Sequence, residues 1–155
     1  TLVLDGGKVS DFTPLIGMPL KKLHLNNTKI SDLALFKGMP LEWLELNSTE
    51  VGDLTPIQGM ALTGLLLDQT KVTDLTPLKG MPLTDLSFCG TQVSDLAPLK
   101  GMPLINLNLG ATRVSDLTQL KGMSLDELDI DGTPAAEQPT PQWLISAGVK
   151  VTSPK

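Results

Sequence analysis

The sequence has little cysteine, few aromatic side chains and no excess of basic charge. A single cysteine, Cys89, excludes an internal disulfide framework and leaves the compartment open between cytoplasmic and extracytoplasmic. Aromatic residues make up 3% of the 155 residues and tyrosine is absent, so the chain has few of the large anchors found at tight interfaces. The net charge of −5 argues against nucleic acid or an anionic membrane surface as the partner.

Long hydrophobic runs and targeting signals are missing as well. No stretch approaches the roughly 18 apolar residues that a membrane span needs, so we expect no membrane insertion. No signal peptide is visible. The chain opens directly on a strand-like stretch, Thr1 to Leu4, and we therefore expect it to be a segment of a larger protein.

What the sequence does contain is one unit that recurs from end to end. Its clearest copy runs from Leu75 to Phe88, and its marker aspartates recur every 21 residues: Asp11, Asp32, Asp53, Asp74, Asp95 and Asp116. A fixed period of this length predicts stacked supersecondary units, that is, a solenoid. We assign residues 1–133 to an N-terminal half repeat plus six copies. Residues 134–155 read as a proline-rich link and a C-terminal cap with a short helix.

Each unit divides into a strand half and a turn half. The Leu-x-Leu alternation, as at Leu65 and Leu67, predicts a short strand, and stacking of the units predicts a parallel sheet of about seven strands. In the turn half, a Pro is followed three residues later by Gly, which leaves room for a single 3₁₀ turn. We expect the repeated Asp to cap this turn through backbone N–H groups. A calcium track is the alternative, and one carboxylate per repeat is too few ligands for it.

The pattern Leu-x-x-Leu-x-Leu-x-x-Thr-x-Val-x-Asp-Leu-x-Pro-Leu resembles the leucine-rich repeat. The Asp-Leu-x-Pro-Leu return is similar to the short bacterial repeats of the internalins. The Leu-Lys-Gly-Met-Pro-Leu stretch resembles repeats in large planctomycete-type proteins, which sometimes carry kinase domains. The resemblance implies an α/β-type solenoid with its strands on the concave face, short 3₁₀ turns on the convex face, and protein binding on the concave surface.

One position departs from the family pattern. Threonine stands where the family usually carries Asn or Cys, at Thr28, Thr49, Thr70, Thr91, Thr112 and Thr133. We therefore expect these threonines to replace the usual Asn ladder. Because a hydroxyl satisfies fewer backbone groups than an amide does, the loop geometry should differ slightly from the common type.

Binding residues must lie at positions that the repeat leaves free, and these face outward beside the Leu-x-Leu core. Two patches stand out there. The first is a mixed cluster around Trp43, the residue type most often central to an interface. The second is acidic and indicates either a basic partner or an ordinary solvated face. The residues we predict to bind a protein partner on the concave face are Lys22, His24, Trp43, Glu45, Leu66, Asp68 and Asp85.

Catalysis finds little support, and we expect no enzyme, no metal and no cofactor. His24 and Glu45 lie on adjacent predicted strands, but the nearest nucleophiles, Ser87 and Cys89, are three strands and roughly 14 Å from His24. The leading interpretation is therefore a non-catalytic protein-binding module. Two alternatives stay open: a structural spacer that self-associates through an uncapped N-terminal edge, and an accessory domain tethered to a catalytic domain such as a kinase.

Overall fold

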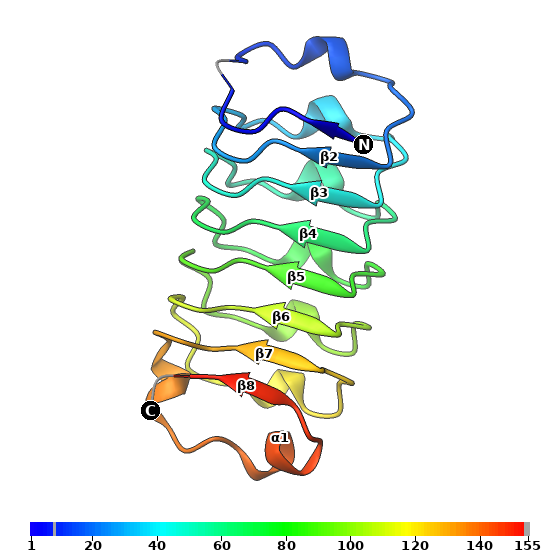
Figure 1. The fold of residues 1–155 in the computed structure, drawn as a ribbon. Helices are drawn as coiled ribbons and strands as arrows, with labels where there is room; N and C mark the ends of the chain where they lie inside the picture. The colour runs from blue at the N-terminus through cyan, green and yellow to red at the C-terminus, as the bar shows by residue number, and fades with distance from the viewer. Residues whose placement is uncertain (8, 154–155) are drawn as a thin grey trace.

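A computed structural model describes residues 1–7 and 9–153; Lys8 and the last two residues of the predicted C-terminal segment, Pro154 and Lys155, lie outside the described residues. The described chain forms one sheet of eight parallel strands in chain order (Figure 1). The strands are β1 (Leu2–Val3), β2 (Lys22–His24), β3 (Trp43–Glu45), β4 (Gly64–Leu66), β5 (Asp85–Ser87), β6 (Asn106–Asn108), β7 (Glu127–Asp129) and β8 (Lys150–Thr152).

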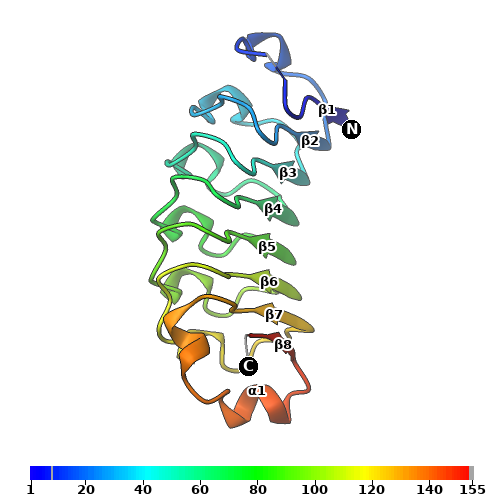
Figure 2. The ribbon, with the colours of Figure 1, turned by 60° about the vertical axis from the view of Figure 1, so that its left-hand side comes forward.

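The sheet follows directly from the repeat period. Leu23, Leu44 and Leu65 pair with one another across adjacent strands, so the register between repeats is 21 residues. The middle leucine of each of the strands β2 to β7 is buried, and the residues on either side of it face the outer surface of the sheet. Turned sideways, the molecule carries its strands along one edge and its turns along the other (Figure 2). The expected solenoid is confirmed.

Short 3₁₀ turns cover the other side of the solenoid, as expected. They are η1 (Thr13–Leu15), η2 (Ala34–Phe36), η3 (Thr55–Ile57), η4 (Thr76–Leu78), η5 (Ala97–Leu99) and η6 (Thr118–Leu120). Each begins two residues after a repeat aspartate, which accepts the backbone N–H of the first residue of the turn; in η4 this bond joins Thr76 N to Asp74 Oδ1 at 2.8 Å. Gly80 follows the same turn at φ 75°, a conformation that a side chain disfavours. The predicted capping role of the aspartates is confirmed.

The C-terminal segment adds one strand to the sheet. After η7 (Pro134–Glu137), the helix α1 (Gln142–Ser146) places Leu144 fully inside the core, with Trp143 partly buried beside it. The chain then returns to the sheet as β8, which pairs with β7 in parallel. The sheet therefore has eight strands rather than about seven, because β8 pairs with the backbone groups of β7 that would otherwise stay unpaired.

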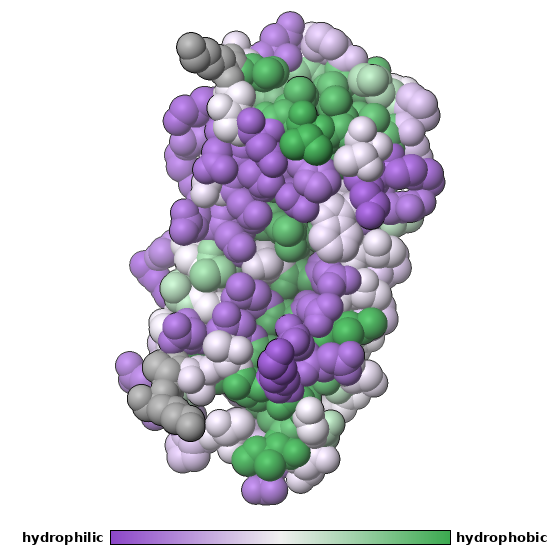
Figure 3. All heavy atoms as spheres, in the orientation of Figure 1, coloured by the Kyte–Doolittle hydropathy of each residue, from purple (hydrophilic) through white to green (hydrophobic). Residues whose placement is uncertain are grey.

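The N-terminal end of the stack is apolar at its surface. Val3, Ile16 and Met18 are 55%, 57% and 38% exposed, and Figure 3 shows a hydrophobic patch at this end of the sheet face. Leu23 and Leu25, in the first complete repeat, are fully buried. No helix in the described part of the chain is both long enough and apolar enough to cross a membrane.

Candidate functional site

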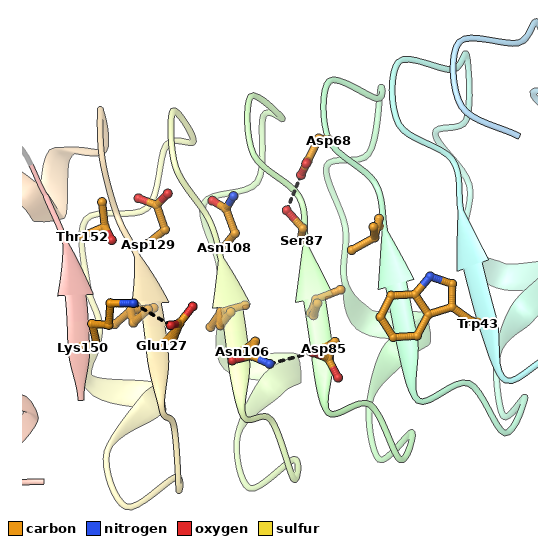
Figure 4. A pocket seen from close by; sticks show the side chains of 14 residues that line it. Trp43, Asp68, Asp85, Ser87, Asn106, Asn108, Glu127, Asp129, Lys150 and Thr152 are labelled. Carbon is orange, nitrogen blue, oxygen red and sulfur yellow. Dashed lines mark hydrogen bonds and ion pairs between the residues drawn. The ribbon is translucent and has the colours of Figure 1, made fainter. Parts of the chain in front are cut away.

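The concave face carries an open groove of about 420 Å³ that crosses the strands from β3 to β8. Most of its lining side chains come from the outward positions of β3 to β8, and Asp68 joins them from the loop after β4 (Figure 4). One end is apolar and the other is polar and mostly acidic. The labelled lining residues are Trp43, Asp68, Asp85, Ser87, Asn106, Asn108, Glu127, Asp129, Lys150 and Thr152. Leu66 of β4, the strand next to that of Trp43, also lines the groove.

Trp43 lies across the neighbouring strand, and a glycine makes that possible. A Cβ atom built on Gly64 would lie 2.1 Å from Trp43 Cε3 and 2.3 Å from Cζ3, far inside van der Waals contact. Gly64 pairs with Trp43 in the sheet register, so the ring covers the bare backbone of β4. An alanine at position 64 would force the indole away from the strand. The pair explains how a large aromatic residue at an outward position is partly buried.

Polar groups of two adjacent strand segments hold the indole in place. Trp43 Nε1 donates to Glu45 Oε1 at 2.9 Å. The other oxygen, Glu45 Oε2, accepts from Asn26 Nδ2 at 2.8 Å and lies 3.0 Å from His24 Nδ1. The Glu45 side chain is only 17% exposed, so these partners supply the hydrogen bonds that water would otherwise provide. Trp43 is therefore pre-positioned by its neighbours.

The structure divides the seven predicted binding residues into two groups. Trp43, Leu66, Asp68 and Asp85 line the groove. The others, Lys22, His24 and Glu45, surround Trp43 outside the groove lining and act on the orientation of its ring.

A ladder of Asx side chains runs along one edge of the sheet, and the threonines do not replace it. Asp5, Asn26, Asn47 and Asp68 each accept, through Oδ1, the backbone N–H of the equivalent residue one repeat later, at 2.8 to 2.9 Å. The prediction that threonine takes over this role was wrong. Each threonine instead closes the loop of its own repeat, as Thr70 Oγ1 does by donating to the Leu67 carbonyl at 2.7 Å. The signal was visible in the sequence as four Asx residues at the 21-residue period.

Different residues supply the acceptor oxygens where the column reaches Cys89 and Gly110. Neither side chain offers an oxygen to the next repeat. The backbone N–H of Gly110 is accepted instead by Asn108 Oδ1 at 3.0 Å, and that of Asp131 by Asp129 Oδ1 at 2.9 Å. Asn108 and Asp129 therefore support their own loops while they line the groove. Asp68 likewise lines the groove and supports the backbone, because it accepts hydrogen bonds from Ser87 Oγ and from the Cys89 N–H.

The groove contains carboxylates in two different states of pairing. Glu127 Oε1 lies 2.7 Å from Lys150 Nζ, and this contact raises the pKa of the Lys150 ammonium. Asp85 has neutral partners: it accepts from Asn106 Nδ2 at 2.7 Å and from Thr84 Oγ1 at 2.7 Å. Sequence reasoning did not anticipate Lys150 or Thr152 in the groove, because their position depends on β8 joining the sheet.

The side chains that could in principle react, Ser87, His24 and Cys89, are not arranged for catalysis. Ser87 donates its hydroxyl to Asp68, and His24 lies against Glu45, three strands from Ser87. Burial, and then the charges of Asp68, Asp129 and Asp131, raise the pKa of the Cys89 thiol, so it stays protonated and weakly nucleophilic near neutral pH. Within residues 1–7 and 9–153, no three His, Cys, Asp or Glu side chains gather in a metal-binding group.

The parallel sheet, the 21-residue register and the opposed 3₁₀ turns define a leucine-rich-repeat solenoid. Among solved structures, the chain is similar to an internalin (InlF) of Listeria monocytogenes, with a TM-score of 0.86 and 27% identity over 98% of this chain. It is also similar to internalin C2 of the same species, with a TM-score of 0.88 and 26% identity over 97% of this chain.

The chain spans 46% of the InlF chain and 69% of the internalin C2 chain. No protein-family model matches the sequence. No curated protein matches it either. The structural likeness therefore supports the leucine-rich-repeat fold. Its structural neighbours are bacterial internalins.

Proposed function

We propose that this chain is a non-catalytic protein-binding module of a larger bacterial protein, and that its partner binds the concave face around Trp43. The observation that carries the proposal is the indole laid over Gly64 and held by Glu45 at one end of the groove. An ordered, partly exposed tryptophan beside a groove is the kind of residue that contributes most to protein interfaces. Fixing its ring before binding lowers the entropy lost when the partner docks.

The free positions of the groove favour binding over catalysis. The threonines, the repeat aspartates and the Asx ladder all satisfy backbone groups, while Trp43, Leu66 and Asp85 are not needed to close any loop. Ser87 donates its hydroxyl to Asp68, a carboxylate that also accepts the Cys89 backbone N–H, and the single histidine, His24, lies three strands away. The pKa of the Cys89 thiol is raised, so the thiol is not activated as a nucleophile. These features support a binding surface carried on a rigid scaffold.

The test is recovery of partner proteins on the immobilised chain, followed by mass spectrometry. Trp43→Ala and Glu45→Lys should each abolish recovery of the same protein, because the first removes the indole and the second removes the group that orients it. Trp143→Phe is the matched control, since it changes the other tryptophan, in α1 outside the groove. If a partner is recovered equally by all these variants, the concave site is not where the partner binds.

A structural role through self-association is the second candidate, and the apolar N-terminal end favours it. Val3, on the edge strand β1, and Ile16, directly after η1, are each more than half exposed at that end, and the free edge of β1 can pair with another chain. Val3→Lys with Ile16→Lys should then convert an assembly into a monomer in light scattering. A wild-type protein that stays monomeric as its concentration rises would rule out this role.

A further inference from the structure

We propose that the segment bound in this groove carries an arginine, whose guanidinium group lies between the Trp43 indole and the Asp85 carboxylate. This inference rests on the proposed function and names the chemistry of the partner. Trp43 and Asp85 both line the groove, from strands separated only by β4 (Figure 4). Gly64 on β4 has no side chain between them. The ring itself occupies this position over β4, so its outer face lies next to β5, the strand that carries Asp85.

The aromatic side of this space already attracts a cation. Lys22 Nζ lies 5.7 Å from the centroid of the Trp43 ring, within the range of a cation–π interaction. Lys22 is exposed and its ammonium group stands at the end of a flexible side chain, so an incoming cation can displace this ammonium from the ring at little cost. The backing of β4 and the bond to Glu45 keep the ring still while one cation replaces another.

The acidic side is a fixed carboxylate that has no cationic partner among residues 1–7 and 9–153. Asp85 is half-buried, and its two oxygens accept one hydrogen bond each, from Asn106 and from Thr84. An ionised carboxylate has about four acceptor positions, so about two are left for a ligand. Glu127, in the same column of side chains, has its charge matched by Lys150 and is a weaker candidate.

The charge of the whole groove favours a cationic ligand over a neutral one. Its lining holds four carboxylates, Asp68, Asp85, Glu127 and Asp129, and one ammonium, Lys150, which gives a net charge of −3. A guanidinium fits this space better than an ammonium does. It is planar, so it stacks on the indole, and its forked N–H groups can bond a carboxylate in pairs.

The experiment uses the full chain labelled with ¹⁵N and a defined probe, the peptide acetyl-Gly-Gly-Arg-Gly-Gly-amide. The chain has only two tryptophans, so the two indole N–H signals can be assigned with Trp143→Phe. The peptide should move the Trp43 indole signal and the Asn106 side-chain amide signal saturably, and leave Trp143 in place. The same peptide with citrulline, which keeps the shape but loses the charge, should bind at least tenfold more weakly.

Two variants with equal loss of charge separate the site from general attraction. Asp85→Asn should weaken the arginine peptide at least tenfold. Glu137→Gln should leave it unchanged, because Glu137 is an exposed carboxylate of η7 outside the groove. Asp85→Asn changes no volume, so folding is not at risk in the decisive variant. Trp43→Ala should abolish the Asn106 response.

Several results would overturn the inference. They are absence of saturable binding, equal binding of the citrulline peptide, and equal effects of Asp85→Asn and Glu137→Gln. A Trp43 signal moved by a neutral oligosaccharide such as cellotetraose, but not by the arginine peptide, would point to a glycan instead. If the arginine peptide fails while Trp43→Ala still abolishes partner recovery, only the arginine assignment falls. Loss of both effects removes the concave site altogether.

Discussion

The contact between Trp43 and Gly64 makes a prediction whose sign depends on the background. In the wild-type chain, Gly64→Ala places a Cβ 2.1 Å from the indole, so the ring must leave β4 or the strand must shift. Overpacking of this kind typically costs about 1 to 3 kcal/mol of unfolding free energy. The bond from Trp43 Nε1 to Glu45, 2.9 Å long, is lost when the ring moves.

The same substitution should have the opposite effect when the ring is absent. Gly64 has an ordinary strand conformation with no positive φ, so alanine fits its backbone. Without the indole, alanine in place of a strand glycine should stabilise the protein by about 0.5 to 1 kcal/mol, because glycine loses more conformational freedom on folding. The coupling between the two sites is then about 1.5 to 4 kcal/mol.

The assay is a double-mutant cycle of urea unfolding followed by circular dichroism, with Trp43→Ala, Gly64→Ala and the double variant. Trp143 fluorescence gives an independent probe of unfolding that is present in all four proteins. In the Gly64→Ala protein, emission from Trp43 should also shift to longer wavelength as the ring enters water. Equal effects of Gly64→Ala in both backgrounds would show that the ring does not rest on β4, and the pre-positioned indole would have to be abandoned.

Three further predictions concern the scaffold. Leu65→Ala in the middle of the core should lower the free energy of unfolding by about 2 to 5 kcal/mol in urea titrations, and a loss below 1 kcal/mol would contradict a close-packed core. Asp68→Ala should lower the free energy of unfolding by about 1 to 3 kcal/mol, because it removes the acceptor of the Cys89 backbone N–H and of the buried Ser87 hydroxyl. Asp68→Asn should cost much less, since Asn can accept in the ladder as Asn47 does. Equal losses for the two variants would exclude the ladder role. Hydrogen bonds from the turn threonines lower the pKa of four exposed repeat aspartates, Asp11, Asp53, Asp74 and Asp116. Stability should therefore be retained above about pH 4 and fall as the pH drops through the lowered pKa values. Melting temperatures that do not change between about pH 5 and pH 2 would refute this.

The Asx ladder shows how the repeat tolerates variation at one of its structural columns. Where Cys89 and Gly110 interrupt the column, Asn108 and Asp129 supply the missing acceptors from a different position in the repeat. The two solutions satisfy the same kind of backbone N–H group. The substitution has a consequence for the surface, because it commits two groove residues, Asn108 of β6 and Asp129 of β7, to loop support.

The sequence by itself determined the architecture, because the signals for it are local and repeated. Leu-x-Leu specifies a strand with one buried face, Asp two residues before a turn caps it, and Gly ends it. Six copies of these signals at a period of 21 leave stacking in register as the way to bury every leucine face. The strands, the 3₁₀ turns and the capping aspartates could therefore be predicted with their residue numbers.

Only the tertiary structure decided which free side chains act together. The contact of Trp43 with Gly64, the bonds from Asn26 and His24 to Glu45 and the bond from the Cys89 backbone to Asp68 each join residues in neighbouring repeats. Such contacts depend on side-chain rotamers and on which neighbour lacks a Cβ, and no periodic pattern encodes either. The addition of β8 is a similar case, because its register is set by the open edge of β7 and not by the repeat. The 21-residue period determines which side chains form a column across the strands. The contacts between neighbouring columns decide which of these side chains remain free to bind a partner.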